Sequence, residues 1–120
     1  MTGEQPWLTV GPEHYVAWRK AYSLSPSSAS PLVPCPVCGH RELFRYYVLD
    51  EHEPRVFQGV QFEGRGRLWE WCASCRTFEY LPDGYVPKAW APWLNVASEA
   101  LRTDPTPIEQ ARIAGPLQAG

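Results

Sequence analysis

The four cysteines are the residues of this 120-residue chain whose types and spacing could most directly do chemistry. They form two pairs with two residues between the partners, Cys35 with Cys38 and Cys72 with Cys75. A two-residue spacer allows a tight turn to direct both sulfurs at one ion about 2.3 Å away. Without a secretory signal, two such pairs indicate a metal site with four thiolate ligands. We expect one structural Zn2+, bound by all four cysteines.

The residue after each pair bears on which metal is bound. Gly39 follows the first pair and can take positive φ without steric cost, which curls the chain under the ion. Arg76 stands at the equivalent place after the second pair, so that turn either takes a left-handed conformation at about 1 kcal/mol or is built differently. Iron remains chemically possible in such a site, but we favour zinc because the second pair lacks the glycine. A redox dithiol or two disulfides fit less well, since redox pairs usually occur once and no secretory signal is visible.

The sequence contains no constellation that would support catalysis. All four ligand positions of the expected site are protein thiolates, which leaves no open position for a catalytic water. The chain has no nucleophile elbow, phosphate-binding loop, zinc-protease motif or dinucleotide fingerprint. We therefore expect that the protein is not an enzyme and that its metal only stabilises the fold.

The segment between the two cysteine pairs is typical of β-strands. Aromatic and β-branched residues predict strands over 43–49, 55–63, 67–72 and 77–81. The polar residues 50–54 predict a turn, and the sequence Gly64-Arg65-Gly66 predicts the end of a hairpin. Gly59 is interpreted as a β-bulge.

This order of cysteine pairs and strands resembles a zinc ribbon over about residues 33–82. Members of that superfamily carry two such turns on β-hairpins and clamp one zinc above a small antiparallel sheet. The resemblance implies the metal and the fold but not the function, because zinc ribbons serve many roles. We expect a single α+β domain over residues 1–120, with the zinc ribbon at 35–81.

Two flanking segments are expected to elaborate the ribbon. The segment 6–24 is expected to contain one helix, with Pro12 at its first position and an aromatic face made of Tyr15, Trp18 and Tyr22. The Ser/Pro-rich linker 25–34 predicts an exposed loop.

The C-terminal arm, residues 82–120, is rich in Pro and Trp and is expected to be partly helical. One short helix is predicted over 94–101. A second helix is predicted to start at Thr106, which would form a capping box with Glu109, and to end before Gly115.

Charge gives little reason to expect a nucleic-acid partner. The formal net charge is −2 with a pI of about 5.9, and residues 35–81 hold six Arg against seven carboxylates. The alternative, a nucleic-acid-binding ribbon, would use Arg65 and Arg67 beside Trp69 and Trp71. We instead expect both tryptophans beneath the C-terminal arm, because residues two apart in a strand share a face.

Protein binding is the function class that the sequence favours. Trp, Tyr and Arg dominate interface hot spots, and an acidic protein can be steered towards a basic target. Candidate contacts are the acidic turn, Asp50, Glu51 and Glu53, and the expected hairpin end, Arg65 and Arg67.

Three short motifs, at residues 35–39, 69–72 and 90–93, resemble small bacterial immunity proteins of polymorphic toxin systems. That resemblance implies a cytoplasmic protein that neutralises a toxin by covering its surface. The absence of a secretory signal and of any long apolar run likewise predicts a cytoplasmic protein with no membrane partner.

Overall fold

A four-stranded mixed sheet organises the chain in a computed structural model that describes residues 6–115. The elements are β1 (Leu8–Thr9), α1 (Pro12–Ser23), β2 (Leu43–Phe57), β3 (Val60–Cys72), β4 (Thr77–Pro87), the 3-10 turn η1 (Ser98–Ala100) and α2 (Thr106–Ala114). In the strand order β1-β4-β3-β2, only β1 pairs in parallel, with β4. The α+β class is confirmed, but the purely antiparallel sheet is wrong because β1 was not anticipated.

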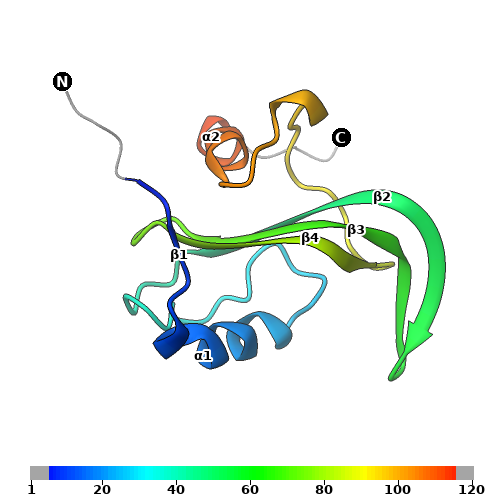
Figure 1. The fold of residues 1–120 in the computed structure, drawn as a ribbon, viewed down its shortest axis with the longest axis horizontal. Helices are drawn as coiled ribbons and strands as arrows, with labels where there is room; N and C mark the ends of the chain where they lie inside the picture. Colours follow the sequence, from blue (N-terminus) through cyan, green and yellow to red (C-terminus); the bar gives the residue numbers. More distant parts are fainter. Residues whose placement is uncertain (1–5, 116–120) are drawn as a thin grey trace.

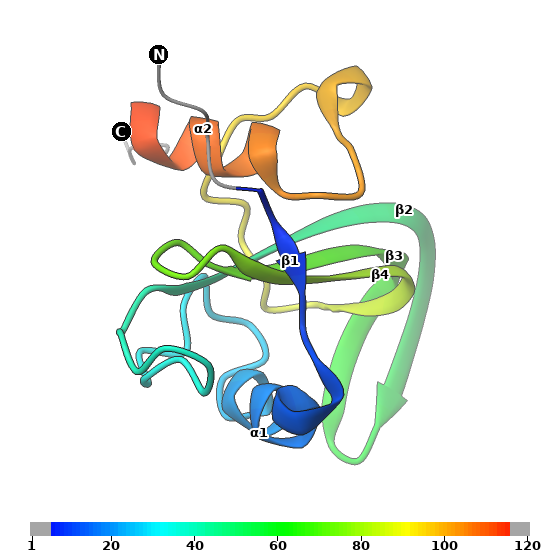
Figure 2. The same cartoon turned by 60° about the vertical axis from the view of Figure 1, so that its left-hand side comes forward.

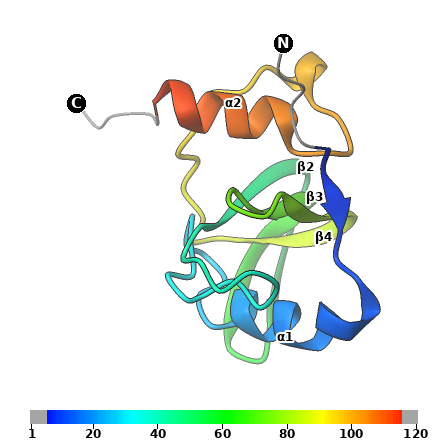
Figure 3. The ribbon, with the colours of Figure 1, turned by 90° about the vertical axis from the view of Figure 1, so that its left-hand side faces the viewer.

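Different segments cover the two faces of the sheet. α1 lies on one face, and α2 with the C-terminal arm lies on the other (Figure 1, Figure 2 and Figure 3). Trp69 and Trp71 of β3 are fully buried and pack with Leu94 and Ile108, which confirms that both lie beneath the C-terminal arm. Because both faces of the sheet are covered, the half of β3 that ends at Cys72 is buried. Its sequence is therefore rich in aromatic residues and does not alternate between one apolar and one exposed polar face.

The β2–β3 hairpin is longer than expected, and its turn lies elsewhere. β2 continues through residues 50–54, and β3 continues through Gly64 and Gly66. The two-residue turn is Gln58-Gly59, with φ of 50° and 80°. Positive φ at both central residues is the geometry of the type I′ turn, which matches the twist of a hairpin. The predicted turn at 50–54, the hairpin end at 64–66 and the bulge at Gly59 are therefore wrong.

Gly64 and Gly66 instead allow the backbone of β2 to approach β3 closely. A Cβ at Gly64 would lie 1.9 Å from the Glu51 carbonyl oxygen, and one at Gly66 would lie 1.9 Å from that of Val48. Register shifts occur at the same places in both strand pairs. Figure 1 shows the hairpin curving away from the sheet towards the side of α1. Bulges increase strand bending, so these glycines and bulges accompany the curve.

The helices begin close to where their sequence signals indicated. α1 starts at Pro12, as predicted, and Trp18 and Tyr22 of its aromatic face are buried. Tyr15 is 43% exposed and lies outside that face. The predicted helix over 94–101 is wrong, because only η1 forms there.

The predicted start and end of α2, Thr106 and Gly115, are confirmed, but the capping box is wrong. The Asp104 carboxylate accepts the Thr106 N–H at 2.9 Å. Glu109 turns inward instead and accepts the indole N–H of Trp71 at 2.9 Å. The helix is therefore tied to the sheet by the carboxylate that was expected at its cap.

Candidate metal centre

Two turns at one end of the sheet bring the four cysteines together. Cys35 and Cys38 precede β2, whereas Cys72 ends β3 and Cys75 precedes β4. The four sulfurs lie within 4.8 Å of one another. Within residues 6–115 they form the single group of potential metal ligands.

The sulfur separations fit one metal ion. Four thiolates about 2.3 Å from a tetrahedral ion lie about 3.8 Å apart. The Sγ atoms of Cys35 and Cys75 are 3.9 Å apart, and those of Cys38 and Cys72 are 3.7 Å apart. An ion bound there would have its coordination completed by the chain itself, so the arrangement suits a structural role rather than Lewis-acid catalysis.

The two cysteine turns have the same backbone construction despite their different sequences. Gly39 has φ 83° and donates its N–H to the Cys35 carbonyl at 2.8 Å. Arg76 has φ 57° and donates its N–H to the Cys72 carbonyl at 3.0 Å. Arg76 therefore takes the left-handed conformation, and its guanidinium lies 4.0 Å from the centre of the Trp7 ring. The missing glycine consequently gives no ground for preferring zinc over iron.

The cysteine thiols differ in acidity before a metal binds. The pKa of Cys35 is lowered to about 5, chiefly because the Cys72 thiol donates to its thiolate. The Val37 N–H, 3.3 Å from the Cys35 sulfur, acts in the same direction. The pKa of Cys72 is raised by that same pairing and by burial, and burial raises the pKa of Cys75. Among Cys35, Cys72 and Cys75, the surroundings of Cys35 therefore most favour the thiolate form. A bound cation would favour that form at all four cysteines.

α1 forms the wall of the centre. Trp18 and Tyr22 pack with Cys35, Cys72 and Leu43 in one buried cluster. The Tyr22 hydroxyl lies 2.8 Å from the carbonyl oxygen of Phe44 and 3.0 Å from that of Trp71. Burial raises the pKa of Tyr22 well above its ordinary value, which keeps the hydroxyl protonated as a donor. α1 is therefore fixed to both strands at the cysteine end.

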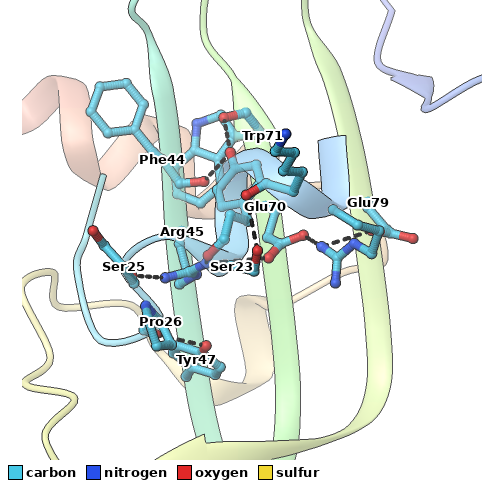
Figure 4. A network of polar contacts seen from close by, with 12 residues as sticks. Ser23, Ser25, Pro26, Phe44, Arg45, Tyr47, Glu70, Trp71 and Glu79 are labelled. Atoms are coloured by element: carbon cyan, nitrogen blue, oxygen red, sulfur yellow. Dashed lines mark hydrogen bonds and ion pairs between the residues drawn. The ribbon is translucent and has the colours of Figure 1, made fainter. Parts of the chain in front are cut away.

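A buried ionic network on the same face was not anticipated from the sequence. Arg45 of β2 and Glu70 of β3 are opposite each other in register, and both are almost fully buried. Glu70 forms an ion pair with Arg19 of α1, which also lies 3.0 Å from Glu79 (Figure 4). The sequence did contain a signal for this network, because Arg45 and Glu70 are charged residues within two otherwise aromatic strands. Such residues are rarely buried unless they are paired.

The Ser/Pro-rich linker is a loop, as expected, but it is only partly exposed, because the same network holds it. Arg45 donates to the Ser25 carbonyl at 2.5 Å, and its own N–H donates to the Ala29 carbonyl at 2.8 Å. The Tyr47 hydroxyl donates to the Pro26 carbonyl at 3.0 Å (Figure 4). The linker therefore runs along the edge of β2.

The basic residues predicted to contact a partner are engaged with carboxylates. Arg67 makes a two-pronged ion pair with Asp50, at 2.8 and 2.9 Å. Arg65 pairs with Asp83 of β4. These arginines lie within β3, not at a hairpin end, so the predicted basic tip is wrong.

The acidic residues do not form a turn either. Glu53 lies 2.7 Å from Arg55 on the same strand. Glu51 is exposed and stands opposite Arg65 in the strand register. Asp50, Glu51 and Glu53 are instead spread along the edge strand β2 among compensating arginines.

Neither helix within residues 6–115 has the length and hydrophobicity needed to cross a bilayer. Comparisons with protein-family models, with curated proteins and with solved structures find no match to this chain.

Proposed function

We propose that this chain is a zinc-stabilised protein-binding protein, with its contact surface on the hairpin end far from the cysteines. The observation that carries the proposal is an uncharged, exposed hairpin end. Residues 56–62 contain no charged side chain, and Val56 and Phe57 are 67% and 64% exposed. Exposed apolar residues that gather at one place, rather than being scattered, mark interaction surfaces.

Zinc is the metal that we propose for the cysteine centre. The zinc-ribbon resemblance and the tetrahedral spacing of four sulfurs support it, although a four-thiolate site also suits iron. Native mass spectrometry of protein purified without added metal should find one zinc per chain. Iron would instead give visible absorption bands, which zinc lacks because its d shell is filled.

The alternative, a nucleic-acid-binding ribbon, has less support. Its two arginines, Arg65 and Arg67, are already paired with carboxylates. Its two tryptophans, Trp69 and Trp71, are buried and have no exposed ring face for stacking on a base. A phosphate contact would first have to break an ion pair.

More specifically, we propose an inhibitor of a bacterial toxin, on the strength of the resemblance to immunity proteins and the acidic net charge. This finer proposal predicts a toxic protein that becomes harmless when it is co-expressed with this chain. A neighbouring gene would be the first candidate to test.

Photo-cross-linking from the hairpin end tests the general proposal. A photoreactive phenylalanine analogue at position 57 should give a discrete cross-linked protein in the source cell, identified by mass spectrometry. The same analogue at Val16, which is 80% exposed on α1, is the matched control. Cross-links of equal yield from both positions, or none from position 57, would overturn the proposal.

A further inference from the structure

We propose that Cys38 is an oxidation site, at which hydrogen peroxide converts the metal centre into a metal-free form with a disulfide between Cys38 and Cys72. The release of metal in this reaction rests on the proposed zinc centre. The disulfide itself needs only the cysteines, and neither step depends on the proposed protein-binding surface.

The four sulfurs differ in their access to solvent. Cys35 and Cys72 are 2% and 0% exposed, whereas Cys38 and Cys75 are half-buried. The two buried cysteines belong to the cluster that Trp18 forms with them, and the other two pack at its edge. Because a bound cation favours the thiolate form at all four positions, access decides which sulfur a small oxidant meets. Peroxide should therefore react at Cys38 or Cys75 first.

Hydrogen bonding distinguishes these two accessible sulfurs. The Thr77 hydroxyl lies 3.2 Å from the Cys75 sulfur and can donate to its thiolate. Such a donor stabilises the charge on sulfur and makes the thiolate a weaker nucleophile. Among the described residues, no backbone N–H or hydroxyl group donates to the Cys38 sulfur, which instead faces the Cys72 sulfur. Cys38 should therefore be the first to react.

Cys72 is placed to complete the reaction, because its sulfur lies 3.7 Å from that of Cys38 and is shielded from the oxidant. The Cys38 thiolate attacks one peroxide oxygen, so that an S–O bond forms, the O–O bond breaks and hydroxide leaves. The Cys72 thiolate then attacks the resulting sulfenic sulfur, an S–S bond forms, and a second hydroxide leaves. Two thiolates thus lose two electrons in total, and hydrogen peroxide is reduced to two hydroxide ions.

The disulfide would remove two of the four ligands of the centre. Bond formation brings the sulfurs of Cys38 and Cys72 from 3.7 Å to about 2.0 Å, a separation that no longer allows both to bind one ion as thiolates. Only Cys35 and Cys75 would remain as ligands, so we expect the metal to pass to a chelator. Because Cys38 and Cys72 belong to different turns, the disulfide would link the two turns in place of the metal.

Peptide mapping after limited oxidation tests this proposal. The metal-loaded full chain is treated with equimolar hydrogen peroxide beside a zinc-responsive dye, its remaining thiols are alkylated, and it is digested with trypsin without reduction. Trypsin cleaves at Arg41 and Arg67, between the two turns, and at no residue within either turn. We expect two tryptic peptides joined through Cys38 and Cys72, with zinc released in step with the disulfide.

Thr77→Val tests the preference for Cys38, because it removes the hydroxyl near Cys75 and keeps the shape of the side chain. The share of disulfide that contains Cys75 should rise in this variant, since the Cys75 thiolate loses a donor. Thr9→Val, at an exposed position of β1, is the matched control and should leave the map unaltered. The same map for both variants would overturn the selection of Cys38 by hydrogen bonding.

A disulfide within one turn, a map dominated by Cys75, or sulfinic acid at Cys38 without a disulfide would overturn the oxidation site. The expected disulfide with all zinc retained would overturn the release of metal. A chain that holds no metal before oxidation would overturn the proposed zinc centre, and the disulfide map would then decide the oxidation site by itself.

Discussion

The two ends of the β2–β3 hairpin are built from similar residues and are held in opposite ways. At the cysteine end, Leu43 and Cys72 are in register and completely buried beneath α1. At the turn end, Phe57 and Val60 are also in register, yet they are 64% and 37% exposed. One long hairpin, whose course is visible in Figure 1, therefore runs from an enclosed end at the cysteines to an exposed apolar end.

The difference shows how a small chain can keep an exposed apolar surface that does not pack against its own core. The cysteine end gains order from the four thiols, the Tyr22 hydroxyl and the Arg45–Glu70 network. The turn end has only strand pairing and a two-residue turn. Because the buried residues of the hairpin lie towards the cysteine end, the turn end can keep apolar residues that do not contribute to the core.

Loss of one cysteine should have the largest effect. Cys72→Ala removes a ligand and should cost roughly 10 kcal/mol of metal-binding energy, which exceeds the stability of many domains. We expect loss of the bound metal in native mass spectrometry and loss of the near-ultraviolet circular dichroism signal. Ser74→Ala, an exposed residue of the same turn, is the matched control and should retain both. A metal-free Cys72→Ala protein that still unfolds cooperatively would show that the cysteine end does not depend on metal.

The next largest effect should come from Gly66→Ala, at a position between the two ends of the hairpin. The new Cβ would lie 1.9 Å from the Val48 carbonyl oxygen, so β2 and β3 must move apart at a cost of about 3 kcal/mol. Gly84→Ala is the control, because Gly84 of β4 pairs with Gly66 and a Cβ added to it would meet no atom within 4 Å. Urea unfolding should show a lower midpoint for Gly66→Ala alone. Equal midpoints would mean that the close approach is not needed for the fold.

The cysteine end was the more predictable part of the fold and site. The spacing of Cys35, Cys38, Cys72 and Cys75 is a local signal, because each pair must turn tightly to reach one ion. The burial of Trp69 and Trp71 followed from strand alternation. These inferences needed only residues close together in the sequence.

The turn end and the ionic network were missed for physical reasons. Gly64 and Gly66 look like turn residues, but they are needed for the approach of β2, a partner that the sequence does not reveal. Arg45 and Glu70 are buried because α1 and the linker fold over them. The two residues of β1 are too few to show a period.

Tyr22→Phe should have a moderate effect at the cysteine end. It removes the hydroxyl shared between the carbonyls of Phe44 and Trp71, at an expected cost of about 1–2 kcal/mol for a buried hydrogen bond. Tyr15→Phe, on the same helix but 43% exposed, should change stability by a few tenths at most. The free energies of unfolding in urea decide between them. Similar values for both variants would show that the Tyr22 hydroxyl does not hold α1 to the strands.

The smallest effect is expected at the turn, and its sign should be favourable. Gln58 has φ 50°, in the left-handed region that glutamine rarely adopts, and Gly59 follows with φ 80°. Gln58→Asn creates the Asn-Gly pair preferred in type I′ turns and should stabilise the protein by about 0.5 kcal/mol. Gln61→Asn, on the adjacent strand, should instead be neutral or slightly destabilising, because Asn is disfavoured in strands. The urea midpoint should therefore rise only for Gln58→Asn, since the turn end has no metal or buried cluster to compensate for a strained residue. A fall in the midpoint would mean that Gln58 makes a contribution that backbone conformation does not explain.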